Sequence, residues 1–450
     1  MEKGQAGLDY GQGRIDRLFF KIFIPTLLGM IFNALITIVD GIFVGRGVGP
    51  DGIAAVNIIA PLFMVTTGVG LMFGIGASVV AGIAMSQKDY KRASGNVTAG
   101  FIASTVVIGC VVLTCLIVTE PVVRLLGSSD QLLDNTTGYL LYLLPGLVPF
   151  MWQSIGMMVI RLDGSPKYAM MCNIVPAVLN IVLDWWFVFP LGMGVRGAAL
   201  ATAIAGIIGG GMALTYFRRS YVIKFTSKIE SGWKSVGAQA RIGAAAFVTE
   251  VAMSVMMLTG NYVFMRSFGE SGVAAYSISC YLFPLIFMIN NAVAQSAQPI
   301  ISYNYGGGAQ RRVNKALKVS LGVAVVCGLI ATTGIAVCAR GIVGMFIPVD
   351  CEAGKIAVAG LPIFAMSAIF FALNIAFIGY WQSIKRAGLA LALTLLRGVV
   401  FLVPLFVVMS WLFPAWGMWG AVPVSEMLTL IIIIIAFYVR ERSGRRCVGN

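Results

Sequence analysis

The sequence contains no histidine, and only 11% of its 450 residues are charged. Soluble chains carry about 25% charged residues on average. The eight cysteines are scattered without a CxxC pair, and most of them lie in apolar stretches. A zinc site or a disulfide framework is therefore not expected, because both need cysteine or histidine at characteristic spacings. Any proton relay in this chain would have to use carboxylates.

Motifs of common enzymes are also missing. The sequence contains no HExxH, no GxSxG and no P-loop, and nothing in it resembles a channel filter. Residues 1–17 are polar and of mixed charge, and the first apolar run is too long for the core of a signal peptide. We therefore expect neither an enzyme nor a cleavable signal peptide.

Long apolar runs dominate what is present, since 59% of the residues are hydrophobic. A run of about 20 apolar residues can cross a bilayer as a helix, and these runs are too continuous for the alternating strands of a barrel. The sequence predicts an all-α polytopic membrane protein with twelve transmembrane helices. The expected spans are 18–44, 53–85, 95–118, 136–160, 168–190, 197–217, 240–265, 272–303, 314–338, 356–380, 387–411 and 418–439.

The net charge of +14 follows the predicted topology. With a cytoplasmic N-terminus, 25 of the 32 Lys and Arg residues fall on the inner side, 6 fall outside, and Arg397 lies within a span. This positive-inside bias predicts a multi-pass protein of the cytoplasmic (inner) membrane with both termini in the cytoplasm. The basic residues therefore indicate contact with membrane lipids and not with nucleic acid.

The longest predicted cytoplasmic loop, 218–239, separates two halves with six spans each, 1–217 and 240–450. GPDGIAAVNI at 49–58 matches GESGVAAYSI at 269–278. Two further pairs match at nearly the same spacing: Lys91-Arg92 with Arg311-Arg312, and GVRGAA at 194–199 with GMWGAV at 417–422. Because six is even, we expect two parallel six-helix bundles related by a pseudo-two-fold axis along the membrane normal. Transporters with this symmetry bind substrate between their halves.

Four carboxylates lie inside predicted spans: Asp40, Asp184, Glu250 and Glu426. A charge at the bilayer centre costs at least about 2.5–3.5 kcal/mol, so such residues usually face the bundle interior and have a function. For two of them a purely structural role is the alternative: Asp40 could mark the outer membrane interface near Arg46, and Glu426 could satisfy a contact between helices. The four carboxylates outnumber Arg397, which favours cationic substrates.

Neutral oxygens accompany the first two carboxylates. Asn180 precedes Asp184 by one helical turn, so the two side chains share a helix face. The residues that could complete an all-oxygen cavity for a proton or a small hard cation are Asn33, Thr37, Asn180 and Thr202.

The chain resembles the multidrug and toxic compound extrusion (MATE) family over residues 16–440, especially its bacterial and archaeal branch with an essential aspartate in the first helix. The motifs that carry the resemblance are TIVDGIFVGRGVGPDGIAA (37–55), NIVLDWWFVF (180–189), GVRGAALAT (194–202), PIISYNYGGG (299–308) and GMWGAVPVSEMLTL (417–430). It implies a proton- or sodium-coupled antiporter that exports drugs or other amphipathic organic cations by alternating access. No cofactor other than the coupling ion is implied, and we expect a monomer.

The resemblance also implies roles for single residues. Asp40, Asn180, Asp184 and Thr202 match the cation site of the amino-terminal lobe, Pro25 matches a proline linked to helix bending, and Tyr139 matches a polar residue that lines this lobe. Some members carry a second acidic pair in the carboxyl-terminal lobe. Glu250 matches its first member, but Asn374 stands where the second acid is expected, so we place the coupling site in the amino-terminal lobe.

The paired carboxylates suggest a mechanism, because two like charges in a poorly solvated lobe resist simultaneous ionisation. A proton or Na⁺ would relieve this repulsion and change which conformation is favoured, linking cation and drug binding. The alternative is a flippase for a lipid-linked oligosaccharide from the same superfamily. A flippase would need several cationic residues to hold a pyrophosphate, and here only Arg397 lies deep in a span.

Overall fold

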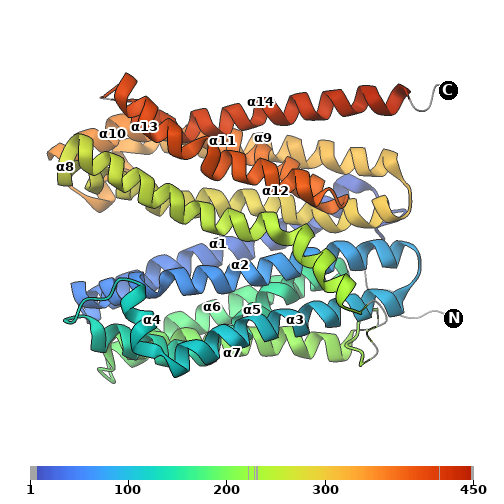
Figure 1. Cartoon of the computed structure of the whole chain (residues 1–450), viewed down its shortest axis with the longest axis horizontal. Helices are drawn as coiled ribbons and strands as arrows, with labels where there is room; N and C mark the ends of the chain where they lie inside the picture. Colours follow the sequence, from blue (N-terminus) through green and yellow to red (C-terminus); the bar gives the residue numbers. More distant parts are fainter. Residues whose placement is uncertain (1–7, 221, 228, 230–231, 415, 447–450) are drawn as a thin grey trace. The chain divides into compact units, whose positions relative to one another are not determined.

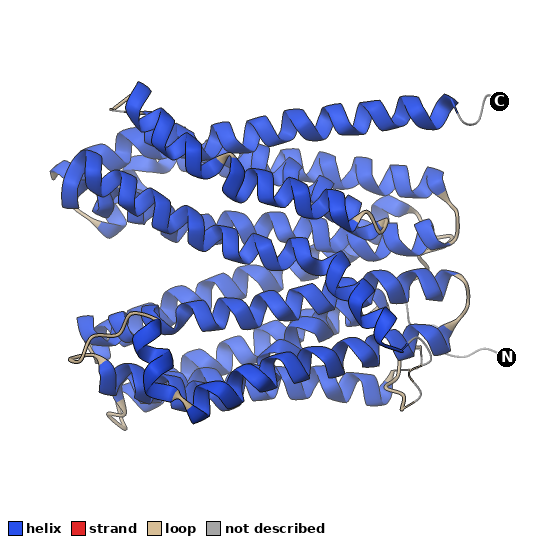
Figure 2. Cartoon of the chain, viewed as in Figure 1, coloured by secondary structure: helices blue, strands red, loops and turns tan. Residues whose placement is uncertain are grey.

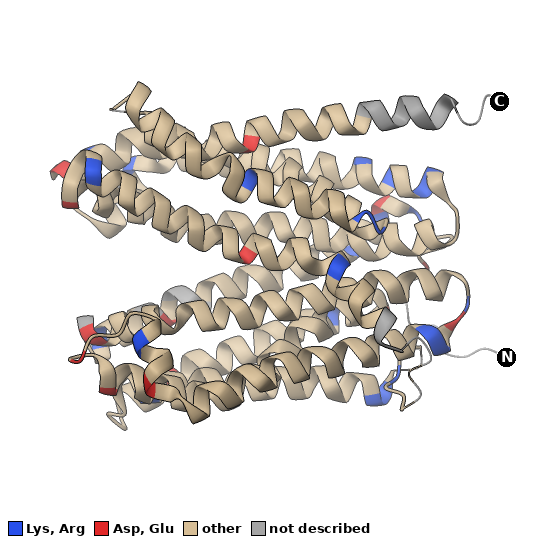
Figure 3. Ribbon diagram, viewed as in Figure 1, with Lys and Arg blue, Asp and Glu red and all other residues tan. Residues whose placement is uncertain are grey.

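The chain folds into helices joined by short loops (Figures 1 and 2). The computed structural model describes residues 8–220, 222–227, 229, 232–414 and 416–446, and it contains no strand among them. Figure 3 shows that the charged residues gather at the ends of the helices and that few lie along their interiors. This distribution agrees with helices that cross an apolar layer.

Seven helices precede the loop near residue 225. They are α1 (Ile15–Gly47), α2 (Pro50–Ser86), α3 (Tyr90–Ile117), the short α4 (Thr119–Leu125), α5 (Leu133–Leu162), α6 (Pro166–Val188) and α7 (Gly194–Arg219). The remaining elements are α8 (Gly232–Gly306), α9 (Gln310–Phe346), α10 (Glu352–Ala365), α11 (Ser367–Ser383), α12 (Ala387–Leu395), the π-helical segment η1 (Leu396–Val400), α13 (Leu402–Leu412) and α14 (Gly417–Arg446).

The predicted number of spans agrees with this arrangement. Among the described residues, eleven helical stretches are long and apolar enough to cross a membrane. The longest, Ser235–Gly306, is interrupted at Gly269, whose φ of 61° and ψ of −149° are not helical. Dividing α8 at this glycine gives two spans and a total of twelve, which confirms the predicted all-α polytopic class.

Backbone geometry repeats between the two halves of the chain. Three positions with positive φ in the first half have counterparts with positive φ about 220 residues later: Gly49 and Gly269, Lys88 and Gly308, and Gly164 and Lys385. Residues other than glycine rarely adopt positive φ, so the shared conformation at the two pairs that include a lysine reflects the same turn. The internal repeat seen in the sequence is therefore also present in the loops between the spans.

The chain forms two compact units whose limits differ from the predicted lobes. The first unit combines residues 1–250 with 298–316 and 382–387, and the second contains the rest of the chain. The end of α8 and the start of α9 thus pack with the first half. The predicted division at loop 218–239 stays a prediction.

Small residues let the helices of the first unit approach closely. A Cβ added to Gly146 on α5 would lie 2.4 Å from the Ala203 Cα on α7, and one added to Gly210 would lie 2.3 Å from the Pro149 carbonyl oxygen. Such close backbone contacts replace the hydrophobic driving force that is absent between helices in lipid. They hold α5 and α7 side by side, and α6 packs against both.

The segment before α1 is fastened within the same unit by Arg312 on α9. Its guanidinium donates hydrogen bonds to the carbonyl oxygens of Tyr10 (2.9 Å) and Gly13 (2.7 Å) and to Asn304 Oδ1 (2.8 Å). The Tyr10 hydroxyl in turn donates to the carbonyl oxygen of Arg161 at the end of α5. The segment therefore links α5 to the junction between α8 and α9.

Candidate cation site in the amino-terminal lobe

The first feature of the candidate site is a pair of carboxyl groups on neighbouring helices. Asp184 on α6 is completely buried, and Asp40 on α1 is partly buried. Their carboxyl groups lie close enough for the charge of Asp40 to act on Asp184. Two ionised carboxylates are both acceptors, so a hydrogen bond between them requires a proton on one of them.

The pair has no other partner among the residues that the structure describes. Both oxygens of Asp184 and Oδ1 of Asp40 are buried without a hydrogen bond. No ion pair found among these residues includes either carboxylate. Buried carboxylates are normally paired or hydrogen-bonded, because an unpaired buried charge is strongly destabilising. The geometry therefore suits a group that is neutralised by a proton or by a bound cation.

Neutral polar side chains lie beside the pair. Asn180 is one turn before Asp184 on α6, and its Nδ2 donates to Thr202 Oγ1 on α7 over 3.3 Å. Tyr139 on α5 is buried, and the charges of both aspartates act on its phenol group. The structure thus brings together the four predicted cation-site residues with Tyr139, drawing on α1, α5, α6 and α7.

Three further predicted residues lie on α1. Asn33 is partly buried and has an interaction within the protein, and Pro25 lies inside the continuous helix. The side chain of Thr37 lies outside the part of the structure that is described. The roles of Asn33, Thr37 and Pro25 in ion binding or helix bending stay predictions.

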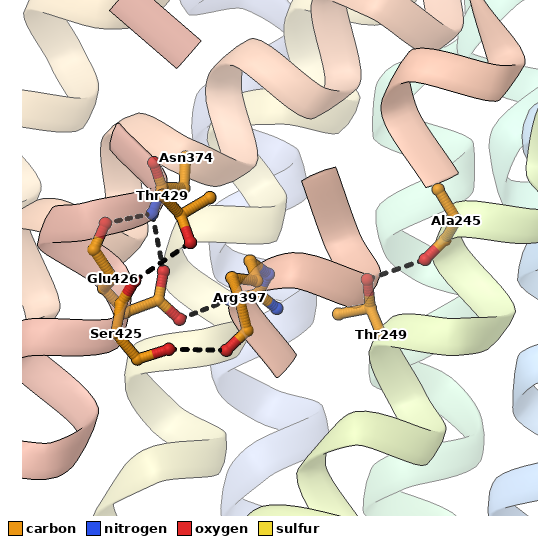
Figure 4. Close-up of polar contacts among 7 residues, drawn as sticks. All are labelled: Ala245, Thr249, Asn374, Arg397, Ser425, Glu426 and Thr429. Atoms are coloured by element: carbon orange, nitrogen blue, oxygen red, sulfur yellow. Dashed lines mark hydrogen bonds and ion pairs between the residues drawn. The ribbon is translucent and has the colours of Figure 1, made fainter. Parts of the chain in front are cut away.

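A separate polar cluster occupies the second unit (Figure 4). Arg397 Nη1 lies 2.7 Å from Glu426 Oε1, and both side chains are buried. Asn374 Nδ2 donates to Glu426 Oε2 (2.7 Å) and to its backbone oxygen (2.8 Å). The hydroxyl of Ser425 donates to the carbonyl oxygen of Arg397 in the π-helical segment η1 (2.8 Å).

This cluster shows which of the four membrane carboxylates the arginine balances. Glu426 forms an ion pair with Arg397 and does not present a free negative charge. A role for Glu426 in binding a cation or substrate stays a prediction. Asn374 contributes to the same cluster as a donor to Glu426. Glu250 is buried but belongs to the first unit, and no ion pair among the described residues includes it. The excess of membrane carboxylates is therefore carried by Asp40, Asp184 and Glu250.

The sequence did not predict that Arg397 is the counter-ion of Glu426. A single arginine and a single glutamate within apolar spans, 29 residues apart, could have suggested a pair, since ionisable groups inside membranes commonly pair with one another. The sequence does not show which helix faces are in contact. It therefore left Arg397 as an isolated charge.

The oxygen atoms around Asp184 fit a proton or a monovalent hard cation. Carboxylate, amide and hydroxyl oxygens are ligands that hard cations prefer. No group of three or more His, Cys, Asp or Glu side chains able to hold a metal ion occurs among the described residues. When Asp40 and Asp184 share one proton or one monovalent cation, the net charge of the site stays low.

Comparison with known proteins decides the family. The MatE family model matches residues 25–186 and 245–408, which together span most of the chain. The chain belongs to the MatE family. The match confirms the resemblance found in the sequence.

Known relatives and structures support this assignment. The MATE chain is 26% identical to the multidrug export protein MepA of Staphylococcus saprophyticus over 438 residues, covering 93% of each protein. It is equally similar to MepA of Staphylococcus aureus over 428 residues, with the same coverage. Its fold matches a structure described as the outward-facing conformation of a multidrug resistance MATE family transporter, with a TM-score of 0.92, 22% identity and coverage of 99% of this chain and 100% of the other.

A second structural neighbour comes from Pyrococcus furiosus. It is described as a transporter of the MOP superfamily in which the reverse polarity of the binding pocket suggests a different function. The TM-score is 0.90 at 22% identity, and the alignment covers 98% of each chain. Together with the apolar helices, these matches identify the MATE chain as a multi-pass integral membrane protein with the fold of this transporter family.

Proposed function

We propose that this MATE-family protein exports amphipathic organic molecules in exchange for H⁺ or Na⁺. The buried pair Asp40 and Asp184 carries the proposal, because neither has a counter-ion among the described residues. The multidrug export named for the MepA relatives supports drugs as the exported class. We further propose that the protein acts as a monomer in the cytoplasmic membrane with both termini inside.

The pair couples ion and substrate through one equilibrium. With both carboxylates ionised, their repulsion in a poorly solvated lobe destabilises the conformation that holds them together. A proton or Na⁺ removes that repulsion, and Asn180 and Thr202 supply neutral oxygens beside it. A cation that prefers one conformation shifts the protein toward it, and by linkage it changes the affinity for substrate by the same factor.

The available driving force is sufficient for export. One proton that moves inward across about 100 mV releases roughly 2.3 kcal/mol. A pH difference of one unit contributes about 1.4 kcal/mol more. The total of about 3.7 kcal/mol would sustain a gradient of roughly 500-fold for a neutral substrate.

The charge balance favours cationic substrates over the anionic headgroup of a lipid-linked sugar. Arg397 is neutralised by Glu426, so it is not free to bind a pyrophosphate. Asp40, Asp184 and Glu250 leave the membrane interior negative when they are ionised. Aromatic and methionine side chains can hold flat cations through ring faces and soft contacts. This balance makes the flippase alternative the weaker one.

Reconstitution tests the coupling directly. Purified protein in proteoliposomes should move a fluorescent cation such as ethidium uphill when a pH gradient or a sodium gradient is imposed, and applying the gradients separately identifies the ion. The Asp40→Asn variant should bind dye but fail to respond to either gradient. Wild-type protein that responds to neither would refute the proposal.

The substrate class has its own test. An efflux-deficient bacterium expressing the protein should tolerate higher concentrations of ethidium and of a quaternary ammonium biocide than the same strain without it. An anionic drug of similar size serves as the comparison. Protection against the anion alone would contradict the preference for cations.

A further inference from the structure

A buried amide on α5 is not used by the mechanism above. Gln153 is 6% exposed, and its Nε2 donates to the carbonyl oxygen of Cys172 over 2.7 Å and lies 3.3 Å from Asn173 Oδ1. That carbonyl oxygen has no partner within the helix, because the residue four positions later on α6 is Pro176, which has no backbone N–H to donate. The proline therefore creates the acceptor that orients the Gln153 amide.

This orientation leaves the oxygen of the amide without a partner. A carbonyl oxygen can only accept a hydrogen bond, so the amide nitrogen must face Cys172 and the amide oxygen must point away from it. Gln153 Oε1 is buried and has no hydrogen bond within the described residues. A Cβ added to Gly209 on α7 would lie 2.2 Å from this oxygen. Because Gly209 has no side chain, Gln153 Oε1 can occupy this position next to α7.

The amide lies in the same group of helices as the carboxylate pair. Asn173, Asn180 and Asp184 are spaced by seven and four residues, so all three fall within about 40° of one another on one face of α6. Asn173 is about 10 Å from Asn180 along the helix axis, toward the end at Pro166 that we expect to be cytoplasmic. Its Nδ2 would lie 3.1 Å from a Cβ at Gly29, so this face of α6 packs against α1 there.

The internal repeat contains the same feature a second time. Asn374 follows Gln153 by 221 residues, the offset that also relates Gly164 to Lys385. It too is buried, donates its amide nitrogen, and leaves its amide oxygen without a partner in the described part of the chain. In that copy the ion pair of Arg397 and Glu426 adjoins the amide. At Gln153, in the first copy, no ion pair among the described residues lies next to the amide. Its oxygen therefore remains available to a mobile cation.

We propose that Gln153 Oε1 forms a second oxygen site for the coupling cation, Na⁺ or a hydrated proton, between the carboxylate pair and the Pro166 end of α6. This site rests on the proposed function. An amide oxygen is neutral, so it binds a cation more weakly than Asp184 does. A weak site next to a strong one lets an ion leave the carboxylates in steps toward the cytoplasm.

Two independent changes at this site have matched controls. Gln153→Met removes the acceptor at similar volume, and Gly209→Ala displaces the acceptor without removing any polar group. Gln298→Met is the control for the first change, since Gln298 is a buried glutamine whose amide lies 3.4 Å from the Ile75 carbonyl oxygen. Gly211→Ala is the control for the second, because a Cβ there meets nothing within 4 Å.

The experiment compares two modes of transport in proteoliposomes. Ethidium uptake driven by a pH or sodium gradient needs the ion to pass through, whereas dye–dye counterflow without a gradient does not. Gln153→Met and Gly209→Ala should lower gradient-driven uptake about tenfold, the effect of losing one hydrogen-bonding ligand. Counterflow should stay within about twofold of wild type in these variants and in both controls.

The outcomes separate this site from the coupling itself. Unchanged gradient-driven uptake in both variants overturns the proposal, as does an equal loss of uptake and counterflow, which would show a structural role only. If wild-type protein responds to neither gradient, the coupling fails and this site fails with it. A defect under the sodium gradient alone or the pH gradient alone identifies the ion at Gln153.

Discussion

Arg397 and Glu426 form a buried ion pair, with 2.7 Å between Nη1 and Oε1 and side-chain exposures of 4% and 6%. The guanidinium carbon also lies 4.6 Å from the centre of the Phe371 ring. Two charges in apolar surroundings stabilise a fold only as a pair, because each alone would lose its solvation without compensation. The pair therefore joins η1 to α14, and the loss of either residue alone should destabilise the fold.

Removing one member should destabilise the protein more than removing both. Glu426→Leu leaves a buried cation and should lower the free energy of unfolding by about 3–5 kcal/mol. The double variant Arg397→Met with Glu426→Leu should recover most of that loss. Apparent melting temperatures of the detergent-solubilised proteins measure the effect. If the double variant is as unstable as the single one, the two residues do not act as a pair.

Asp40→Asn should abolish gradient-driven export and leave the protein folded. Asparagine keeps the shape of the side chain but cannot bind or release the proton, and it removes one of the two charges that repel each other in the pair. Uphill dye transport measures the first effect, and the elution profile in size-exclusion chromatography measures the second. Normal gradient-driven transport by this variant would remove Asp40 from the coupling site.

Asn180→Ala should weaken coupling less than Asp184→Asn does. Asn180 supplies one neutral group, bonded to Thr202 over 3.3 Å, whereas Asp184 supplies the charge that responds to the cation. Loss of one neutral hydrogen bond costs about 0.5–1.5 kcal/mol, which corresponds to a change of roughly twofold to tenfold. Initial rates of gradient-driven uptake rank the two variants. The reverse order would assign the central role to the amide.

Arg312→Gln should loosen the segment that precedes α1. The substitution removes the charged donor from the carbonyl oxygens of Tyr10 and Gly13, and hydrogen bonds from a charged group contribute about 1.5–3 kcal/mol each. Amide hydrogen exchange over residues 8–14 should become faster than in wild type. Arg311→Gln is the control, since Arg311 is exposed and no ion pair in the described part of the chain includes it. Equal exchange in both variants would deny Arg312 this role.

The class of fold and the presence of functional carboxylates inside the spans could be predicted from the sequence for physical reasons. Apolar runs that match the bilayer thickness predict spans whatever their packing, and a carboxylate within such a run is too costly to be accidental. The pairing of Asp40 with Asp184 came from the family resemblance. Nothing in the local sequence of α1 or α6 shows that these two faces meet.

Other features depend on helix rotation, which the sequence does not show. The contact between Arg397 and Glu426 requires particular faces of η1 and α14 to meet. The free oxygen of Gln153 depends on Pro176 in a different helix and on the space left by Gly209 in a third. The packing of residues 298–316 with the first half likewise follows from tertiary contacts and not from the repeat.

The acidic residue at the end of α5 predicts a pH dependence of stability. Burial raises the pKa of Asp163 above its ordinary value, although hydrogen bonds from Ser220 (2.6 Å) and Tyr216 (2.7 Å) to Oδ2 oppose the shift. Its Oδ1 is buried with no partner among the described residues, which explains why burial prevails.

The sign of the effect follows from linkage. Because the folded state binds the proton more tightly than the unfolded state, Asp163 lowers stability when it is ionised, and that penalty disappears as the pH falls through the raised pKa toward the ordinary value of about 4. An asparagine side chain cannot ionise, so the stability of wild type relative to the Asp163→Asn variant should rise as the pH is lowered from 7 to 4. Melting temperatures of both proteins across this range give the difference. A constant difference, or one that falls toward pH 4, would show that burial does not control this carboxyl group.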